Sequence, residues 1–230
     1  MRALAEPIAR RSNREDQCTG RFWEGRFKSQ KLADETAILA CSSYVNLNPV
    51  RAGVVEVPED SQYTSVYERV RAEKDARKQR TLRESARRRR GKANQRAKPN
   101  QPAFVRSDAW LTPLTINERW SAYQGAMPSK TGCRASDKGF LAMSFEAYLK
   151  LLDWTGRQLR RDHKRGRIPN EVAPVLERIG LSSELWCDLI KRFGKIFKRV
   201  AGTPETLANE SIRRGTRRYR TSNSPLPAPA

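Results

Sequence analysis

A single tyrosine, Tyr44, lies near the end of a short amphipathic segment, with basic residues close to it in the chain. A phenol can attack a phosphodiester and form a covalent phosphotyrosine, which divides strand cleavage and rejoining into two reversible steps. The attacked phosphate needs cationic neighbours, and the candidates are Arg21, Arg26, Lys28 and Arg51. The alternative is structural, because a tyrosine on an amphipathic helix commonly packs in a core with its hydroxyl at the rim. Tyr44 is thus a candidate nucleophile, and the four basic residues are candidate DNA-binding residues.

The element before Tyr44 is predicted to be a strand. Residues 21–30 alternate in part, and Gly25 interrupts the pattern; residues 1–19 before them are polar and irregular. Two aromatic residues of this strand, Trp23 and Phe27, have rings that can stack on bases or pack against the following helix. The strand would therefore present both basic and aromatic side chains.

The element that carries Tyr44 is predicted to be a helix. Asp34 is a suitable N-cap, and apolar residues recur at helical spacing over residues 38–45. Because the residue before a proline is pushed out of the helical region, Pro49 should end this helix near residues 47–48. Gly53 then follows as a turn residue.

The charge balance favours a polyanionic partner. The chain holds 46 Lys and Arg residues against 25 Asp and Glu residues, a formal net charge of +21. Each basic side chain that neutralises a phosphate releases a counterion, so binding should weaken steeply as salt rises. Residues 71–98 alone hold thirteen basic and three acidic residues. A solvated basic surface or a ribosomal-type protein is the alternative interpretation.

Other features narrow the class of protein. There is no long apolar run, so we expect no membrane span, and the first residues lack the features of a signal peptide. The four cysteines are far apart and form no C-x-x-C pair. This pattern favours free thiols in a cytoplasmic protein.

Composition divides the chain into four regions. Residues 1–70 contain the segment with Tyr44, and residues 71–140 are interpreted as a basic, partly disordered linker whose early part has the composition of a polar helix. Residues 141–212 predict a small helical bundle, and residues 213–230 predict a disordered tail. In the bundle, helices are expected to begin after Ser144, Asn170, residue 182 or 183, and Thr203, with the third reaching about residue 200; Gly180 would stop the second.

The second and third helices of this bundle could form a helix-turn-helix. The third helix would supply phosphate contacts from Lys191, Arg192, Lys195, Lys198 and Arg199. Against this, the same helix has a wide apolar face, as the helices of any small bundle do.

The segment around Tyr44 also resembles a known family. The motifs W-E-G-R-F-K-S, D-E and Y-V-x-x-N-P-V-R-A-G, followed by P-E-D-S-x-Y-T-S at residues 58–65, resemble the REP-associated tyrosine transposases of the single-tyrosine HUH superfamily. The resemblance covers residues 20–70. It implies that Tyr44 is the nucleophile on single-stranded DNA and that the basic residues of the preceding strand lie near the DNA. The implied reaction is cleavage and rejoining through a 5′-phosphotyrosine during transposition of a mobile element.

The same resemblance implies an incomplete site. The family's chemistry uses a His-hydrophobe-His pair that holds a divalent metal such as Mg²⁺, which polarises the scissile phosphate. This chain has one histidine, His163, in a basic stretch, where we interpret it as a surface residue. The expectation is an N-terminally truncated catalytic domain with no cofactor of its own. The expected fold class is mainly α, with a remnant strand and helix of a ferredoxin-like α+β domain, a basic linker and a small helical bundle.

We therefore expect a transposase-related DNA-binding protein that acts on hairpin DNA and is catalytically incomplete by itself. A non-catalytic basic DNA- or RNA-binding protein that uses its C-terminal helices is the main alternative. A decayed reading frame without a selected function is the third interpretation.

Overall fold

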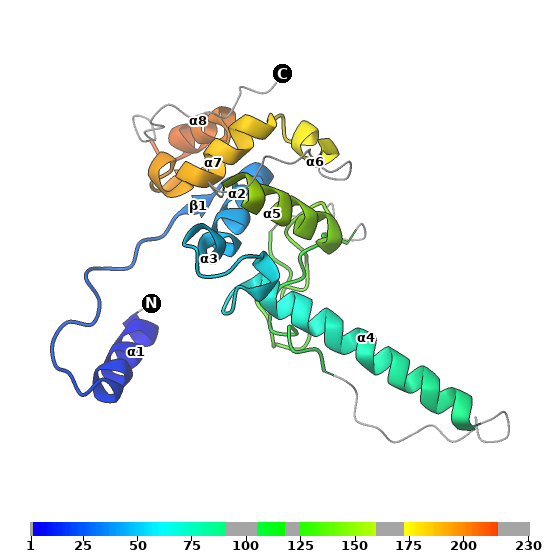
Figure 1. Cartoon of the computed structure of the whole chain (residues 1–230). Coiled ribbons are helices and arrows are strands. Elements are labelled where there is room, and N and C mark those ends of the chain that lie inside the picture. Colours follow the sequence, from blue (N-terminus) through cyan, green and yellow to red (C-terminus); the bar gives the residue numbers. More distant parts are fainter. Residues whose placement is uncertain (1, 91–104, 118–124, 160–172, 216–230) are drawn as a thin grey trace. The chain divides into compact units, whose positions relative to one another are not determined.

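The computed structural model of the chain describes residues 2–90, 105–117, 125–159 and 173–215, and within these it is mainly helical (Figure 1). The expectation of a mainly α fold is therefore confirmed. The chain divides into two compact units, Met1–Lys31 and Leu32–Ala230. The predicted positions of His163 and of the Asn170 cap lie outside the described residues.

The first unit contains one helix where the sequence predicted irregular structure. Helix α1 (Arg2–Glu15) is supported by ion pairs one turn apart, such as Arg10–Glu6 at 2.6 Å and Arg11–Glu15 at 2.8 Å. The predicted strand over residues 21–30 is wrong, since these residues form bends and extended chain without a ladder. An isolated segment has no partner for its backbone hydrogen bonds, and Gly25 further weakens strand formation.

In the second unit the predicted helix around Tyr44 is confirmed. Helix α2 (Glu35–Asn46) begins at Asp34, whose Oδ1 accepts a hydrogen bond of 2.8 Å from the Ala37 backbone N–H. The short helix α3 (Asn48–Arg51) follows directly, with Pro49 in its first turn, and Gly53 turns the chain with φ of +72°. Leu47 separates α2 from α3, which stands as a separate short turn.

The C-terminal helices also begin close to their predicted caps. They are α5 (Phe145–Leu159), α6 (Ala173–Arg178), α7 (Ser183–Ile196) and α8 (Pro204–Arg213). The hydroxyl oxygens of Ser144, Ser182 and Thr203 each accept a hydrogen bond from a backbone N–H in the first turn of α5, α7 and α8, respectively. Gly180, at φ of +67°, follows α6.

Helix α7 ends earlier than predicted. Phe197 is extended, and the short strand β2 (Val200–Ala201) pairs with β1 (Lys31–Leu32). The Ala33 N–H donates to the Ala201 carbonyl at 2.8 Å, which continues this pairing. A distant strand partner therefore ended the helix, and the local apolar pattern of α7 contained no sign of it.

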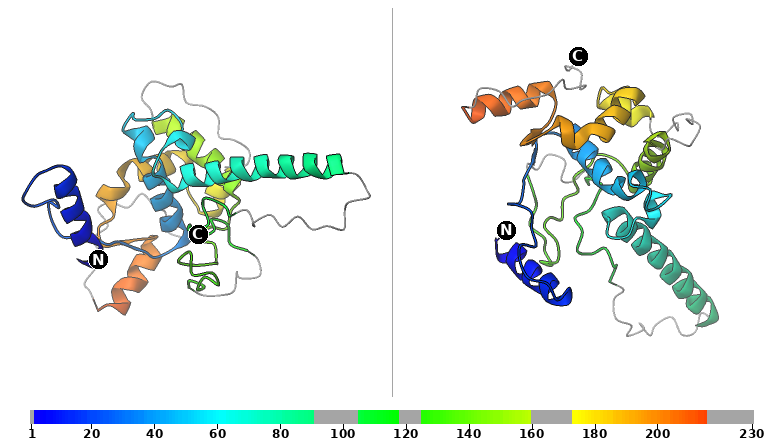
Figure 2. Two further views of the ribbon diagram at one scale, coloured as in Figure 1. Left: turned by 90° about the horizontal axis from the view of Figure 1, so that it is seen from below. Right: turned by 60° about the vertical axis from the view of Figure 1, so that its left-hand side comes forward.

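One hydrophobic core contains helices from residues 1–70 and from residues 141–212, which were predicted to be separate regions. Helix α7 packs on α2 and α5, and α3 packs on α5 (Figures 1 and 2). The largest fully buried side chains come from α2, α5, α7 and the residue between α2 and α3: Leu39, Leu47, Tyr148, Leu152, Trp186 and Ile190. The predicted boundaries at residues 70 and 141 therefore do not separate two cores, because the apolar faces of α2 and α7 cover each other.

Buried polar contacts fix the same elements. The Asn46 side-chain amide donates to the Tyr148 hydroxyl at 2.8 Å, and the Ser65 hydroxyl donates to Asn46 Oδ1 at 3.1 Å. Burial raises the pKa of Tyr148 to about 12, although the hydrogen bond from Asn46 partly opposes the shift. Asp34 connects the start of α2 to the start of α8, since its Oδ2 accepts hydrogen bonds from the Thr203 N–H and the Thr206 hydroxyl, both at 2.6 Å.

The early part of the predicted linker is one long helix, in keeping with its composition. After the 3-10 turn η1 (Pro58–Asp60), helix α4 (Ser65–Arg90) continues through the whole early part of the basic region. Its first turns are packed, with Val66 and Ala72 fully buried. Helix formation here follows from its composition, which has neither Gly nor Pro and many straight-chain residues.

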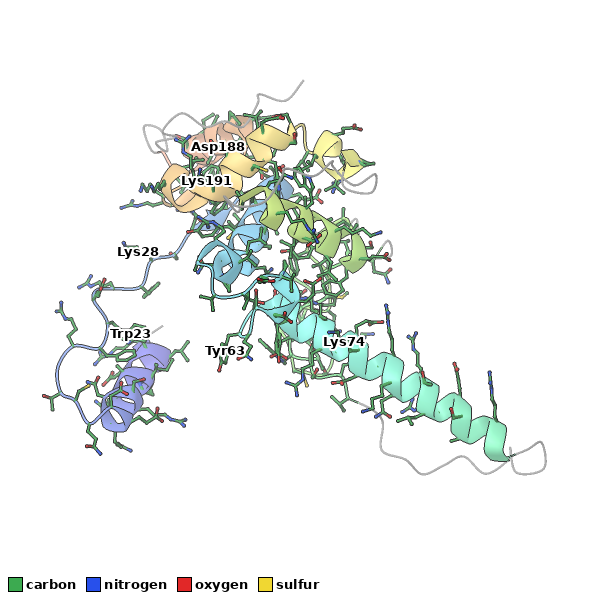
Figure 3. The ribbon with its side chains drawn as sticks, viewed as in Figure 1. Trp23, Lys28, Tyr63, Lys74, Asp188 and Lys191 are labelled. Carbon is green, nitrogen blue, oxygen red and sulfur yellow. The ribbon has the colours of Figure 1, made fainter. Side chains whose placement is uncertain are left out.

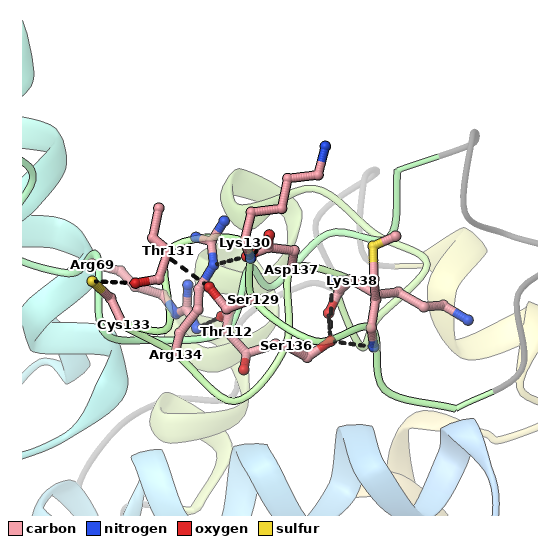
Figure 4. Close-up of polar contacts among 11 residues, drawn as sticks. Arg69, Thr112, Ser129, Lys130, Thr131, Cys133, Arg134, Ser136, Asp137 and Lys138 are labelled. Atoms are coloured by element: carbon pink, nitrogen blue, oxygen red, sulfur yellow. Dashed lines mark hydrogen bonds and ion pairs between the residues drawn. The ribbon is translucent and has the colours of Figure 1, made fainter.

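Two connecting segments complete the described structure. Residues 105–117 and 125–144 contact each other through an isolated parallel bridge between Thr115 and Leu141. Asp137 organises the second segment, because its carboxylate accepts from the Lys130 N–H at 2.9 Å and from the Arg134 guanidinium at 2.7 Å (Figure 4). Among the described residues, no helix is long and apolar enough to cross a membrane.

Candidate nucleic-acid interface

Tyr44 lies on the face of α2 that packs against α7. Its ring centroid is 5.6 Å from that of Phe193, and it is half-buried. The approach to α7 is close at Gly194, where an added Cβ would lie 3.3 Å from the Tyr44 hydroxyl oxygen. That hydroxyl makes no hydrogen bond to any residue that the structure describes. The geometry is that of a core tyrosine with its hydroxyl at the rim.

Arg51 is the predicted DNA-binding residue that the structure does bring to Tyr44. Its guanidinium carbon lies 4.7 Å from the centroid of the Tyr44 ring, a cation–π arrangement. One nitrogen, Nη2, donates to the Lys191 carbonyl at 3.1 Å, while Nη1 is buried without a hydrogen-bond partner. Arg51 thus joins α3 to α7 and retains one unsatisfied donor beside Tyr44.

The surroundings of Tyr44 do not fit a divalent metal. Its neighbours are a guanidinium, a phenyl ring and Gly194 of α7, none of which offers a carboxylate or imidazole ligand. Within the described ranges, no cluster of three His, Cys, Asp or Glu side chains could hold a metal ion. We therefore derive no metal-assisted step at this tyrosine.

The other three predicted DNA-binding residues belong to the first unit. Arg21, Arg26 and Lys28 are exposed, whereas Tyr44 and Arg51 belong to the second unit. Trp23 is 44% exposed, and its indole N–H donates to the Ala5 carbonyl at 3.0 Å, which holds the ring against α1 (Figure 3). A cavity of about 550 Å³ in this unit is lined by Arg21, Arg26 and Trp23 together with residues of α1. The unit therefore combines aromatic and cationic groups, as single-strand binding surfaces do.

Exposed positive charge also lies on the distal segment of α4, which we define as residues 77–90. Every side chain from Arg80 to Ala86 is exposed, and no other described helix or strand lies beside these turns in the views of Figures 1 and 2. The segment contains eight basic residues and one acidic residue, Glu84. It would extend about 21 Å at 1.5 Å per residue. Its basic residues recur on all sides of the helix, so no apolar face is available for packing.

A tyrosine that the sequence did not nominate lies just before this helix. Tyr63 is 98% exposed and has a φ of +65°, a left-handed conformation that is uncommon for a tyrosine (Figure 3). Such a conformation is costly, and exposed aromatic rings are able to stack on bases. The only sequence signal was the position of Tyr63 within the run at residues 58–65.

The basic residues of α7 form a smaller exposed surface. Lys191, Arg192 and Lys195 are exposed, while Trp186 and Phe193 bury the opposite face in the core. Arg192 forms an ion pair of 3.0 Å with Asp188 on the same face. Helix α6 before it has only six residues. The helix-turn-helix interpretation therefore stays an untested alternative, with part of its positive charge already neutralised.

Comparison of the chain with models of protein families, with curated proteins and with solved structures found no match. The resemblance to transposases consequently rests on the sequence motifs alone.

Proposed function

We propose that this chain binds nucleic acid and that the distal segment of α4 is its main phosphate-binding element. The observation that carries the proposal is the high positive charge of α4 together with its distal turns, where every side chain from Arg80 to Ala86 is exposed. No described helix or strand lies beside the distal segment (Figures 1 and 2). Phosphates of a nucleic acid would supply the missing counter-charge.

Repulsion within the helix supports the same conclusion. Arg83 and Arg87 are four residues apart, a spacing at which like charges destabilise a helix. Most helical stability in proteins comes from packing of an apolar face, which this segment lacks, since its one large apolar residue, Leu82, is 54% exposed. Binding to a polyanion would offset the repulsion and stabilise the helix at the same time.

The proposed class of protein is a transposase-related DNA-binding protein, as the motifs around Tyr44 suggest. The preferred partner is single-stranded hairpin DNA, with the exposed rings of Trp23 and Tyr63 available for stacking. We expect no strand cleavage by this chain alone, because the residues that contact Tyr44 supply neither a general base nor metal ligands. Arg51 favours the catalytic alternative, since its unsatisfied Nη1 is suited to a phosphate oxygen near the phenol.

The proposal is tested by fluorescence anisotropy with a labelled hairpin DNA, a duplex and an RNA of equal length. We expect binding that weakens steeply with salt and is tightest for the hairpin. Absence of binding at about 50 mM salt, where phosphate contacts are strongest, would contradict it. The same DNA incubated with Mg²⁺ should give no covalent adduct on a denaturing gel. An adduct that disappears in Tyr44→Phe would instead establish the catalytic alternative.

A further inference from the structure

A cavity of about 300 Å³ lies where the packed end of α4 meets the two connecting segments and the start of α5. Its charged lining comes from Arg69 and Glu73 of α4, from Arg106 and Asp108 of the first segment, and from Arg134 of the second. The volume is at the lower end of the range for small-ligand pockets. Arg69 lies near the end of the span 20–70, but none of these residues belongs to the motifs that carry the resemblance or to the distal segment of α4.

Most of the charge in this cavity is already paired. Arg106 holds both carboxylates of the lining, with contacts of 2.9 Å to Asp108 and 3.2 Å to Glu73. Arg134 is paired with Asp137 at 2.7 Å. Arg69 is therefore the one cation among the lining residues that has no carboxylate within ion-pair distance.

Arg69 is also buried, with 9% of its surface exposed. One nitrogen, Nη2, donates to the Thr112 carbonyl, while Nε is buried without a partner and Nη1 makes no hydrogen bond to any described residue (Figure 4). A buried guanidinium is costly unless its donors and its charge are satisfied. Burial lowers the pKa of Arg69, and the nearby Asp108 carboxylate only partly opposes that shift. The cavity is thus short of negative charge and of hydrogen-bond acceptors.

We infer that this cavity is a binding site for a phosphate-type oxyanion, which Arg69 holds through its free donors. A phosphate group carries the charge that balances Arg69 and offers several acceptor oxygens to a guanidinium. Arg106 and Arg134 line the same space, so their remaining donors can complete the contact. The inference does not depend on the proposed role of the distal segment of α4. The phosphate can be free or part of a nucleic-acid strand.

The test measures binding of inorganic phosphate and pyrophosphate to the full chain by calorimetry and by the thermal unfolding midpoint, against chloride at equal ionic strength. We expect both anions to bind and to raise the midpoint, as any ligand of the folded state does. Arg69→Met, which keeps the apolar stem, should weaken binding at least about tenfold. Arg157→Gln, which removes an exposed arginine of α5 paired with Asp153, is the matched control and should bind normally.

A second variant keeps the test decisive if Arg69→Met does not fold. Ala109 lines the cavity, so Ala109→Glu would place a carboxylate beside Arg69. It should raise the midpoint in the absence of phosphate and abolish phosphate binding. Wild-type protein that phosphate does not stabilise, or an Ala109→Glu protein that binds phosphate normally, would overturn the inference.

Competition identifies the source of the phosphate. If bound hairpin DNA displaces inorganic phosphate, the site takes a phosphate of the strand; if both bind together, it takes a free phosphate compound. Retained phosphate binding after substitution of arginines in the distal segment of α4 separates this inference from the proposed function.

Discussion

The salt dependence of DNA binding should change by a calculable amount when exposed charges are removed from α4. Arg77, Arg80 and Arg83 lie in the distal segment, and all three are exposed. For single-stranded DNA, each phosphate contact contributes about 0.7 to the slope of log K against log salt. Replacing all three by glutamine should therefore reduce the slope by about 2 if each contacts one phosphate. Over a fourfold rise in salt, the loss of affinity would shrink by about 20-fold.

The assay is anisotropy titration of a labelled hairpin DNA from about 50 to 200 mM salt, the range in which phosphate contacts have large effects. The matched control replaces Lys191, Arg192 and Lys195, which are the exposed cations of α7, by glutamine. Both variants lose three charges, and each loses one intrahelical ion pair, Arg77–Glu73 or Arg192–Asp188. The slope of the α7 variant should stay near the wild-type value. An unchanged slope in the α4 variant, or an equal change in both, would refute the assignment to α4.

Three further predictions concern stability. Asp34→Ala should cost about 2–3 kcal/mol in urea unfolding, because it removes the α2 cap and two acceptor contacts to α8; a loss below about 1 kcal/mol would contradict that role. Because the pKa of Tyr148 is raised to about 12, its contribution to the free energy of unfolding is present below pH 10 and is lost as pH rises towards 12. Tyr148→Phe should lack this part of the alkaline loss of stability. An identical dependence of stability on pH in the variant and the wild type would exclude this role of Tyr148. The hydrogen bond from Arg178 lowers the pKa of Glu35, so the contribution of Glu35 to the free energy of unfolding is present above pH 4.5 and is lost as pH falls. Glu35→Gln should therefore lose less stability than the wild type as the solution is acidified. An equal loss of stability in both proteins would count against the Glu35–Arg178 pair.

Local signals in the sequence were sufficient for the starts of α2, α5, α7 and α8. Asp34, Ser144, Ser182 and Thr203 each accept a hydrogen bond from the first turn of a helix, because short polar side chains satisfy the free N–H groups there. Helix α2 likewise ends at Asn46, close to the predicted residues 47–48, although Asn48 directly before Pro49 is itself helical. These signals depend on neighbours within one turn, so no tertiary information is needed to interpret them.

Features that depend on distant partners could not be predicted in this way. The early end of α7 is set by pairing of β2 with β1, more than 160 positions away in the chain. The strand expected over residues 21–30 fails for the converse reason, since no partner segment supplies its ladder. The Arg69 cavity combines residues of α4 with two connecting segments, and no spacing in the sequence links Arg69 to Arg106 or Arg134.

The candidate site was predicted only in part. Arg51 does lie beside Tyr44, because α3 follows α2 directly in the chain. Packing of Tyr44 against Phe193 and Gly194 depends on the fold of α7 onto α2, which the motif around Tyr44 does not encode. The structure thus favours the interpretation of Tyr44 as a packed core residue, and the basic distal segment of α4 becomes the stronger candidate for phosphate binding.

Hydrogen exchange of the full chain with and without hairpin DNA is the sharpest test of whether the distal segment of α4 binds the DNA. The distal segment of α4 has no packed face, so its amides should exchange rapidly in the free protein. We expect saturating DNA to slow amide exchange over residues 77–90 more than over α7. Unchanged exchange of α4 in the bound protein, with protection confined to other helices, would contradict it.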